Sequence, residues 1–442
     1  MLKRINGRED DRGARVNICE VNFSAPFKSG LEYGSPARGA WNIVHTAMLV
    51  PGGHQIYVCA AGCLRGVVLT AAEMKAEHRF SSISVRENNF IRGDMEKLII
   101  DGVSDVIERL PSRPPAILLY TSCVHHFIGC DLTSVYRQLR EKYPDIDFAR
   151  CYMDPTMRKR GLTPDEETRV SIFQLLKLKA FEKYHVNIVG NDLSIDESSE
   201  LHKLLKVGNC RVSDLTLCKS YDEFQEMSSA ELNIVTFPPA RAAAKDLEKR
   251  LGQKFLYLPL SYGYDEIEDN MKKLAEELNI EAPNYVYERE NCESALQKVS
   301  KLLGNTPIAI DYSATPRPVG LARLLSEHGM RVERIYLDSF NGEERKDFEW
   351  LKEHCPYIDI YATVNVKMRF LERSTDRKTV AIGQKAAYFT GTEYFVNMIE
   401  GGGMYGFDGI CRLAEMLEDA YMHPKETRNI IQIKGWGCGV CS

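Results

Sequence analysis

The chain has 442 residues, of which 44% are hydrophobic and 27% are charged, and its formal net charge is −5. This composition is typical of a globular protein, and the length predicts two or three α/β domains of roughly 100–200 residues each. The charge gives no sign of a nucleic acid partner, and no window approaches the ~18 apolar residues of a membrane span. The first residues are charged instead of apolar, so we expect a cytoplasmic protein without a secretory leader.

Strands and helices alternate along the whole chain. An apolar strand at 55–58 runs into Cys59, a helix is expected over 94–109, and a strand at 116–120 runs directly into Cys123. Further expected elements follow in chain order: strands at 232–236, 255–258, 307–312, 331–337 and 357–362, and helices at 240–251, 267–278, 319–328, 343–354 and 407–420.

This βα alternation predicts an α/β fold of three Rossmann-like domains with parallel sheets. We place the N-terminal domain, which carries most candidate ligands, at residues 1–185. A middle domain is expected at 186–302, and a C-terminal domain with a cysteine-containing tail at 303–442.

Thirteen cysteines are many for a cytoplasmic chain, where a disulfide framework is not expected. Metal binding or redox chemistry is the alternative explanation. Five of the cysteines have no partner at ligand spacing, and we expect them to be small buried hydrophobic residues: Cys151, Cys210, Cys218, Cys292 and Cys355.

Two cysteine pairs follow apolar strands. Cys59 and Cys63 flank small residues that leave room for a bulky inorganic core, and Cys123 and Cys130 form a second pair at an equivalent strand end. Ligands bind at this edge of parallel sheets, and iron–sulfur clusters are held by thiolates on such loops. Zinc is the competing metal because histidines lie nearby, although neither pair has the tight CxxC spacing of structural zinc sites.

Five other features have both a functional and a plain interpretation. His125 and His126 are either donors to cluster sulfur or ordinary residues at the start of a helix. Cys19 is a possible ligand or a structural thiol, and the Cys438/Cys441 tail could bind a metal or be a frayed end. Glycines at 401–409 could bring backbone amides to an anion or only turn the chain, and Arg317 could point into a cleft or lie in a surface turn.

Several segments together resemble the nitrogenase component 1 family. They are Ser-Pro-Ala-Arg-Gly-Ala at 35–40, Gly62-Cys63, Glu-Asn-Asn-Phe-Ile-Arg-Gly at 87–93, Cys-Val-His-His-Phe-Ile-Gly-Cys-Asp at 123–131, Arg317-Pro318, the stretch at 359–367, and Tyr-Gly-Phe-Asp-Gly at 405–409.

The resemblance implies that Cys63 and Cys123 bind a metal cluster, because they match two of the three thiolates that each family subunit gives to its P-cluster. The third family cysteine falls on Ser35, which leaves Cys59, Cys130 or Cys19 as substitutes. The implied metal ligands are therefore Cys63, Cys123, Cys59 and Cys130, and the implied cofactor is a 4Fe–4S or P-cluster-like 8Fe–7S iron–sulfur cluster.

The resemblance also implies the partners. An ATP-dependent iron protein would supply electrons, ATP would enter only through that partner, and a homologous subunit or a second copy of the chain would complete the cluster site.

The ligands of the family's active-site cofactor fall near Thr236-Phe237 and Val396, and these residues cannot bind that cofactor. The expected function is therefore an iron–sulfur oxidoreductase that reduces an unidentified substrate other than dinitrogen. The alternatives are a metallocluster-assembly scaffold or electron-relay subunit, and an α/β protein that binds a nucleotide or sugar.

Overall fold

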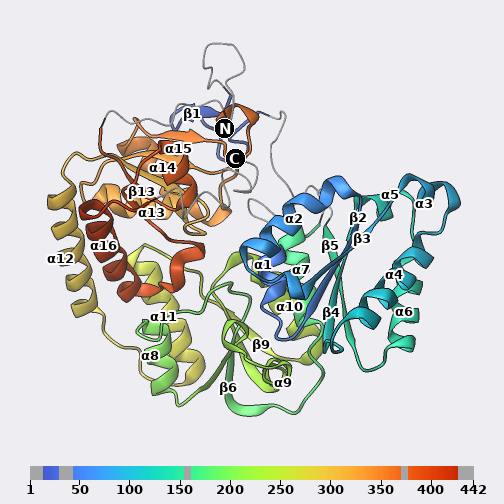
Figure 1. Cartoon of the computed structure of the whole chain (residues 1–442). Coiled ribbons are helices and arrows are strands. Elements are labelled where there is room, and N and C mark those ends of the chain that lie inside the picture. The colour runs from blue at the N-terminus through green and yellow to red at the C-terminus, as the bar shows by residue number, and fades with distance from the viewer. Residues whose placement is uncertain (1–12, 29–42, 154–160, 370–376, 427–442) are drawn as a thin grey trace, which may run out of the picture. The chain divides into compact units, whose positions relative to one another are not determined.

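The computed structural model describes residues 13–28, 43–153, 161–369 and 377–426, and the strands within these ranges form three sheets (Figure 1). All neighbouring strands in the sheets are parallel except the pair that includes the N-terminal strand. The predicted α/β class with parallel sheets is therefore confirmed.

The first sheet has the strand order β3-β2-β4-β5. Its strands are β2 (His54–Cys59), β3 (Phe80–Ser84), β4 (Ala116–Ser122) and β5 (Asp147–Met153), and the helices around it are α1 (Ile43–Met48), α2 (Ala61–Glu73), α3 (Glu87–Arg92), α4 (Met95–Arg109), α5 (Cys123–Phe127) and α6 (Leu132–Lys142). Every residue of β2 and β4 is buried. This burial explains the apolar runs within them, Ile56–Cys59 in β2 and Ala116–Tyr120 in β4.

The second sheet has the order β7-β6-β8-β9. Its strands are β6 (Glu182–Ile188), β7 (Arg211–Asp214), β8 (Ala230–Val235) and β9 (Lys254–Tyr257), and its helices include α7 (Pro164–Phe173), α9 (Tyr221–Glu226) and α10 (Arg241–Leu251). The start of α7 is set locally, because Thr163 and Glu166 cap each other's backbone amides and Pro164 occupies the first turn.

The third sheet has the order β1-β12-β11-β10-β13-β14. Its strands are β1 (Arg15–Asn17), β10 (Ile308–Asp311), β11 (Val332–Tyr336), β12 (Asp359–Tyr361), β13 (Val380–Ile382) and β14 (Phe395–Val396), and the helices that accompany it are α8 (Glu200–Val207), α11 (Tyr264–Leu278), α12 (Val286–Leu303), α13 (Pro318–Glu327), α14 (Arg345–His354), α15 (Gln384–Thr390) and α16 (Gly406–Met422). Strand β1 pairs antiparallel with β12, so the start of the described chain joins its last sheet.

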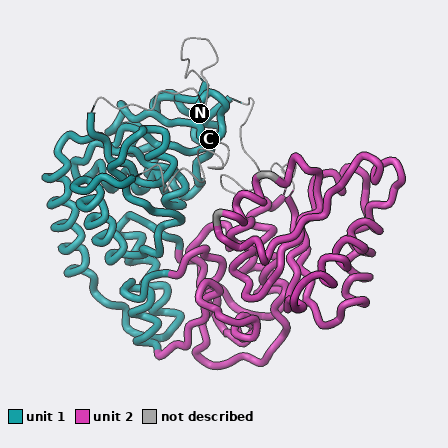
Figure 2. The backbone as a smooth tube through the Cα atoms, viewed as in Figure 1, with its two compact units in different colours: residues 1–34, 195–208, 259–442 teal, residues 35–194, 209–258 magenta. Residues whose placement is uncertain are grey.

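The chain divides into two compact units, shown in different colours in Figure 2. One unit comprises residues 1–34, 195–208 and 259–442 and contains the third sheet. The other comprises residues 35–194 and 209–258 and contains the first two sheets. The three-domain boundaries proposed from the sequence remain a prediction.

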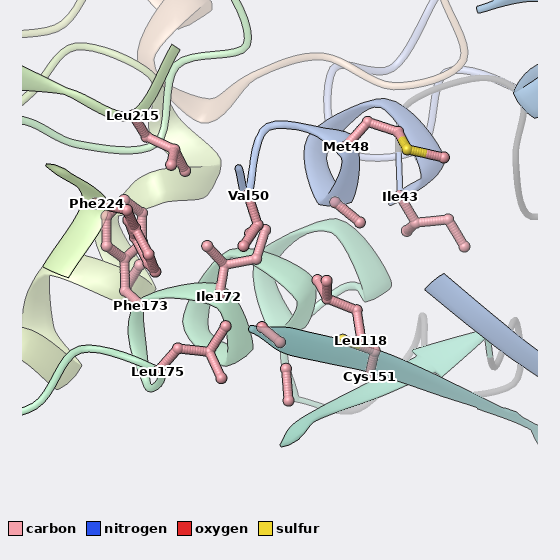
Figure 3. Packing of buried hydrophobic residues seen from close by; sticks show 14 of the residues in the cluster. Ile43, Met48, Val50, Leu118, Cys151, Ile172, Phe173, Leu175, Leu215 and Phe224 are labelled. Carbon is pink, nitrogen blue, oxygen red and sulfur yellow. The ribbon is translucent and has the colours of Figure 1, made fainter. Parts of the chain in front are cut away.

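The first and second sheets share a hydrophobic core. Figure 3 shows side chains of α1, β4, β5, α7 and α9 packed together, among them Leu118, Cys151, Phe173 and Phe224. A separate core on the opposite face of the first sheet is built from alternate strand residues such as Ile56 and Leu119 against α4 and α6. Within the described residues, no helix combines the length and the apolar character needed to cross a membrane.

Candidate metal centre

The candidate site lies between β2 and β4, where the strand order of the first sheet reverses. From β2 the chain continues to β3 on one side, and β4 and β5 lie on the other, so the carboxyl ends of β2 and β4 are neighbours. Cys59 is the last residue of β2, and Cys123 directly follows β4. Ligands of open parallel sheets bind at such a switch point.

Cys63 belongs to the first turn of the helix that follows β2. Its backbone amide donates to the carbonyl of Ala60, 2.9 Å away, and this bond is part of the opening turn of α2. A side chain placed on the neighbouring Gly62 would meet no atom within 4 Å, so there is open space at this residue of the first turn. The first turn of a helix carries partial positive charge, which favours an anionic ligand there.

The thiols of Cys63 and Cys123 are both near enough to the thiol of Cys59 to act on its charge. Burial raises the pKa of Cys59 to about 12, and the neighbouring Cys63 and Cys123 thiols contribute to the increase. Cys59 is fully buried, whereas Cys63 and Cys123 are partly exposed. The structure therefore places Cys63 and Cys123 in the neighbourhood of Cys59, at adjacent strand ends.

A dry aromatic layer lies beneath this edge of the sheet. The rings of Tyr57 and Tyr120 stack with their centroids 4.4 Å apart and nearly parallel planes, and Phe80 stacks on Tyr57 at 5.0 Å. The Tyr57 hydroxyl donates to Gln55, and the Tyr120 hydroxyl donates to the carbonyl of Ile43. Because both hydroxyls are bonded inside the protein, the rings are fixed and the layer excludes water.

His125 and His126 differ in environment. The Nδ1 atom of His125 lies 3.2 Å from the backbone nitrogen of Ser122, at the start of α5. Its Nε2 atom is buried and has no hydrogen-bond partner within the described part of the chain. Burial lowers the pKa of His125, which keeps the imidazole neutral. His126 is exposed, and its ring stacks on Tyr152 at 5.9 Å.

Cys130 lies apart from the other three thiols. It packs against the core on the opposite face of the sheet from Cys59. Burial, together with the charge and hydrogen bond of Glu96, raises the pKa of Cys130 to about 12. Its backbone amide donates to the carbonyl of His125, 3.0 Å away. The structure does not join Cys130 to the group at the switch point.

The remaining candidates belong to the other unit or lie outside the described residues. Cys19 is exposed in the unit that contains the third sheet, where its sulfur lies 3.9 Å from the carbonyl oxygens of Lys352 and Pro356. Ser35, Cys438 and Cys441 lie outside the described residues. Among the residues that the structure describes, no three His, Cys, Asp or Glu side chains are arranged to hold a single metal ion. The ligand assignments remain a prediction.

The switch point of the second sheet is occupied by the chain's own arginine. Arg169, whose side chain is 1% exposed, contacts Asp192 at 2.9 Å and Asp165 at 3.2 Å, and also donates to the carbonyl of Gly190. Its guanidinium lies 4.8 Å from the centre of the Phe237 ring, directly after β8. Charged and aromatic groups of the protein therefore fill this place.

Two features of the unit that contains the third sheet had alternative interpretations in the sequence, and the structure shows the contacts of both. The amides of Glu400 and Gly401 donate to the carbonyls of Ser313 and Ala314, at 2.8 and 2.7 Å, so they bind backbone instead of an anion. Arg317 does not lie in a solvated turn: its side chain is 3% exposed and pairs with Glu266 and Glu343, both at 2.9 Å.

Neither the tyrosine layer nor the partner of Cys130 was predicted from the sequence. The alternation of side chains between the two faces of a strand was a sufficient signal for the tyrosine layer, since Tyr57 and Cys59 are two residues apart and share a face. No sequence signal connects Glu96 with Cys130, because 34 residues separate them and only the packing of α4 brings them together.

Comparison with known proteins agrees with this architecture. Residues 43–419 match the family described as nitrogenase component 1 type oxidoreductase. The nitrogenase iron-molybdenum cofactor biosynthesis protein NifE of Clostridium pasteurianum is 25% identical over 316 residues, which cover 68% of this chain and 65% of that protein, slightly less than two thirds of its length.

Solved structures show the same fold. The structure of nitrogenase Cp1 at pH 6.5 superposes with a TM-score of 0.65 at 14% identity, covering 91% of this chain and 95% of that one. The structure at pH 5 superposes with a TM-score of 0.58 at 15% identity, covering 92% and 94%. The chain belongs to the nitrogenase component 1 type oxidoreductase family.

Proposed function

We propose that this chain is a cytoplasmic iron–sulfur subunit of a nitrogenase-like assembly that accepts low-potential electrons from an ATP-dependent iron protein. The observation that carries the proposal is that Cys59 and Cys123 end or follow adjacent strands at the switch point of the first sheet, and that Cys63 also lies near Cys59. Family membership supports it, because the family match covers residues 43–419 and the sequence resemblance assigns Cys63 and Cys123 as cluster ligands.

The residues at this place fit an iron–sulfur cluster. Thiolates are the ligands that such clusters require, and a low-dielectric surrounding with few charges tunes their potential. Here Cys59 shares a core with the stacked rings of Tyr57 and Tyr120, and His125, two residues after Cys123, has a buried ring nitrogen with no hydrogen-bond partner among the described residues. When bound, the cluster would supply one-electron transfer at low potential, as a 4Fe–4S or a P-cluster-like 8Fe–7S centre.

The roles of the protein groups follow from their positions. Cys63 and Cys123 would hold the cluster at the two strand ends, with Cys59 as the third thiolate in place of the family cysteine that falls on Ser35. The tyrosine layer would keep water from the buried side. The neutral imidazole of His125 would offer its free nitrogen as a hydrogen-bond group.

Exposed apolar side chains beside the thiol loops support a protein partner. Ile91 on α3 is 83% exposed and Phe127 on α5 is 72% exposed, and both helices follow strands whose carboxyl ends share the edge with the thiols. Phe90 and Ile128 are their exposed neighbours. Apolar groups of this kind mark surfaces that another protein covers. A homologous subunit or a second copy of the chain would cover this surface and complete the cluster site.

Dinitrogen is not the substrate that we propose. In the places where the family's catalytic subunits bind the active-site cofactor, this chain has Thr236-Phe237 and Val396. Thr236 donates to the side chain of Asn191, Phe237 lies against Arg169, and Val396 is fully buried. None of these side chains is a metal ligand, so the substrate remains unidentified.

The test is anaerobic purification of the full chain, with quantification of iron and acid-labile sulfide and with electron paramagnetic resonance spectra. We expect several irons per chain, and we expect Cys63→Ala and Cys123→Ala to lose most of them. Cys218→Ala is the matched control, because its half-buried thiol donates to the carbonyl of Asp214, 3.3 Å away, far along the chain from the site. A colourless protein, one that binds only zinc, or equal loss in all three variants would overturn the proposal.

A metallocluster-assembly scaffold is the second candidate, and the similarity to NifE favours it. The two functions differ in what leaves the protein. A reductase keeps its iron and passes electrons to a small substrate when the iron protein and ATP are supplied. A scaffold transfers iron and sulfide to an apo acceptor protein. Measuring iron on both proteins after incubation and separation distinguishes them.

A further inference from the structure

Two cysteines that the cluster site does not use lie together between two helices. Cys292 is on α12 and Cys411 is on α16, and these helices pack side by side in the unit that contains the third sheet (Figure 1). Their sulfur atoms are 3.5 Å apart. Cys292 was expected to be an isolated buried thiol, but the structure gives it a partner 119 residues along the chain.

The two thiols have different access to solvent. Cys292 is fully buried in the apolar stripe of α12 with Leu296 and Val299, and its sulfur lies 3.2 Å from the carbonyl oxygen of Phe407. Cys411 is partly exposed. The hydrogen bond between them lowers the pKa of Cys411 and raises that of Cys292. Cys411 is thus the thiol that a dissolved reagent meets, and it ionises first.

We propose that Cys292 and Cys411 form a redox modification site that closes to an intramolecular disulfide by exchange with a small dissolved disulfide. The Cys411 thiolate attacks one sulfur of the small disulfide, which forms a mixed disulfide and releases one thiolate. The Cys292 thiolate then attacks the Cys411 sulfur and releases the second. The two cysteines lose two electrons and two protons, and the small disulfide gains them as two thiols.

The surrounding contacts make this closure a small movement. A disulfide requires a sulfur separation of about 2.0 Å, so the sulfurs must approach each other while the helices stay in register. Lys298 on α12 and Glu418 on α16 hold the same two helices together further along, with a 2.6 Å ion pair. No strand or loop lies between the two thiols, because the sulfurs already contact each other.

The bond would restrain the wall of a cavity. A small cavity is lined by the start of α16, including Gly406, Gly409 and Leu413, and by Leu260 and Tyr262. Cys411 is on the same helix, two residues before Leu413. Cross-linking α16 to α12 would therefore fix one side of this cavity, which gives the modification a structural consequence beyond the two thiols.

The experiment treats the purified full chain with glutathione disulfide under anaerobic conditions, blocks free thiols with iodoacetamide and maps tryptic peptides without reduction. Cleavage leaves Cys292 in peptide 290–298 and Cys411 in peptide 386–412, each with no other cysteine. We expect these two peptides to become linked and to separate again with dithiothreitol. Cys355, a buried thiol in peptide 353–367, is the internal control and should remain alkylated.

Two variants test the order of the steps. Cys292→Ser should hold glutathione on Cys411 without cross-linking, and Cys411→Ser should leave Cys292 alkylated. The wild-type digest decides the proposal even if a variant fails to fold. The proposal is overturned if wild-type Cys411 remains alkylated, if it retains glutathione without linking to Cys292, or if it links to another cysteine.

Discussion

The thiol of Cys130 lies beside the carboxylate of Glu96, which also accepts a hydrogen bond of 2.8 Å from the backbone amide of Asp131. This contact connects α4 with the loop that follows α5, on the face of the first sheet away from Cys59. A carboxylate next to a thiol opposes the loss of its proton. Cys130 therefore has an environment unlike that of the thiols at the switch point.

The first prediction concerns this difference. Cys130→Ala should leave the iron content and the electron paramagnetic resonance spectrum of the anaerobically purified chain unchanged, because its thiol packs with the opposite core. Cys59→Ala should lower the iron content, since its thiol lies with Cys63 and Cys123. Loss of iron in the Cys130 variant with retention in the Cys59 variant would reverse the assignment. Circular dichroism of both variants shows whether the fold is intact.

A second prediction follows from Glu344, a carboxyl group that is 1% exposed and accepts the amides of Val319 and Gly320 at 2.8 and 3.0 Å. Burial raises its pKa to about 8, despite these hydrogen bonds and the nearby Arg317. At pH values between the ordinary carboxyl pKa and this raised pKa, Glu344 holds a proton in the folded state and releases it in the unfolded state. The free energy of unfolding should therefore fall as the pH rises from about 5 to 8.

The size of this effect should be a few kcal/mol, since a tenfold change in proton affinity corresponds to about 1.4 kcal/mol. Urea unfolding at several pH values measures it. Glu344→Gln removes the titration and should flatten the dependence, whereas Glu349→Gln, at an exposed position on α14, should leave it as in the wild type. A pH dependence that is unchanged in Glu344→Gln would show that this carboxyl group is already ionised in the folded protein.

The third prediction concerns Arg169, which is buried between Asp165 and Asp192. Arg169→Met should lower the free energy of unfolding by about 3–5 kcal/mol, because it leaves buried carboxylates without their counter-ion. Arg109→Met removes an exposed pair with Asp105 and should cost at most about 1 kcal/mol. Adding Asp165→Asn and Asp192→Asn to Arg169→Met should restore much of the loss. If it restores none, packing and not charge accounts for the effect of Arg169.

Local patterns in the sequence were enough to predict much of the fold. The strand expected at 55–58 is observed as His54–Cys59, and the helix expected at 94–109 is observed as Met95–Arg109. Apolar runs and breakers such as Pro111 define these elements without reference to distant residues. The same reasoning placed Cys59 and Cys123 at strand ends, and the parallel pairing of β2 with β4 then makes them neighbours.

Other features depend on contacts that no local pattern encodes. Strand β1 has three residues and is defined by its pairing with β12, more than 340 positions away. Arg317 is ordinary in sequence, and only the packing of Glu266 and Glu343 around it makes it a buried ion pair. Cys130 was grouped with the other thiols from its spacing in the sequence alone. The face of the sheet on which it lies depends on how α4 and α5 pack, which the spacing does not reveal.

The last prediction concerns the exposed apolar surface beside the thiol loops. Ile91→Asp and Phe127→Asp together should weaken association with a homologous subunit or a second copy roughly tenfold or more, because buried apolar anchors at an interface often contribute more than about 1–2 kcal/mol each. The free energy of unfolding of the separated chain should change by less than about 0.5 kcal/mol per substitution, since both side chains are exposed.

Leu178→Asp is the matched control: Leu178 is 74% exposed in the same unit, but it follows α7 instead of a strand of the first sheet. Sedimentation velocity, on the chain alone and with its partner, measures the association. If the Leu178 variant weakens assembly and the double variant does not, the interface lies elsewhere on this unit, and the thiols at the switch point would have to hold their cluster without a covering subunit.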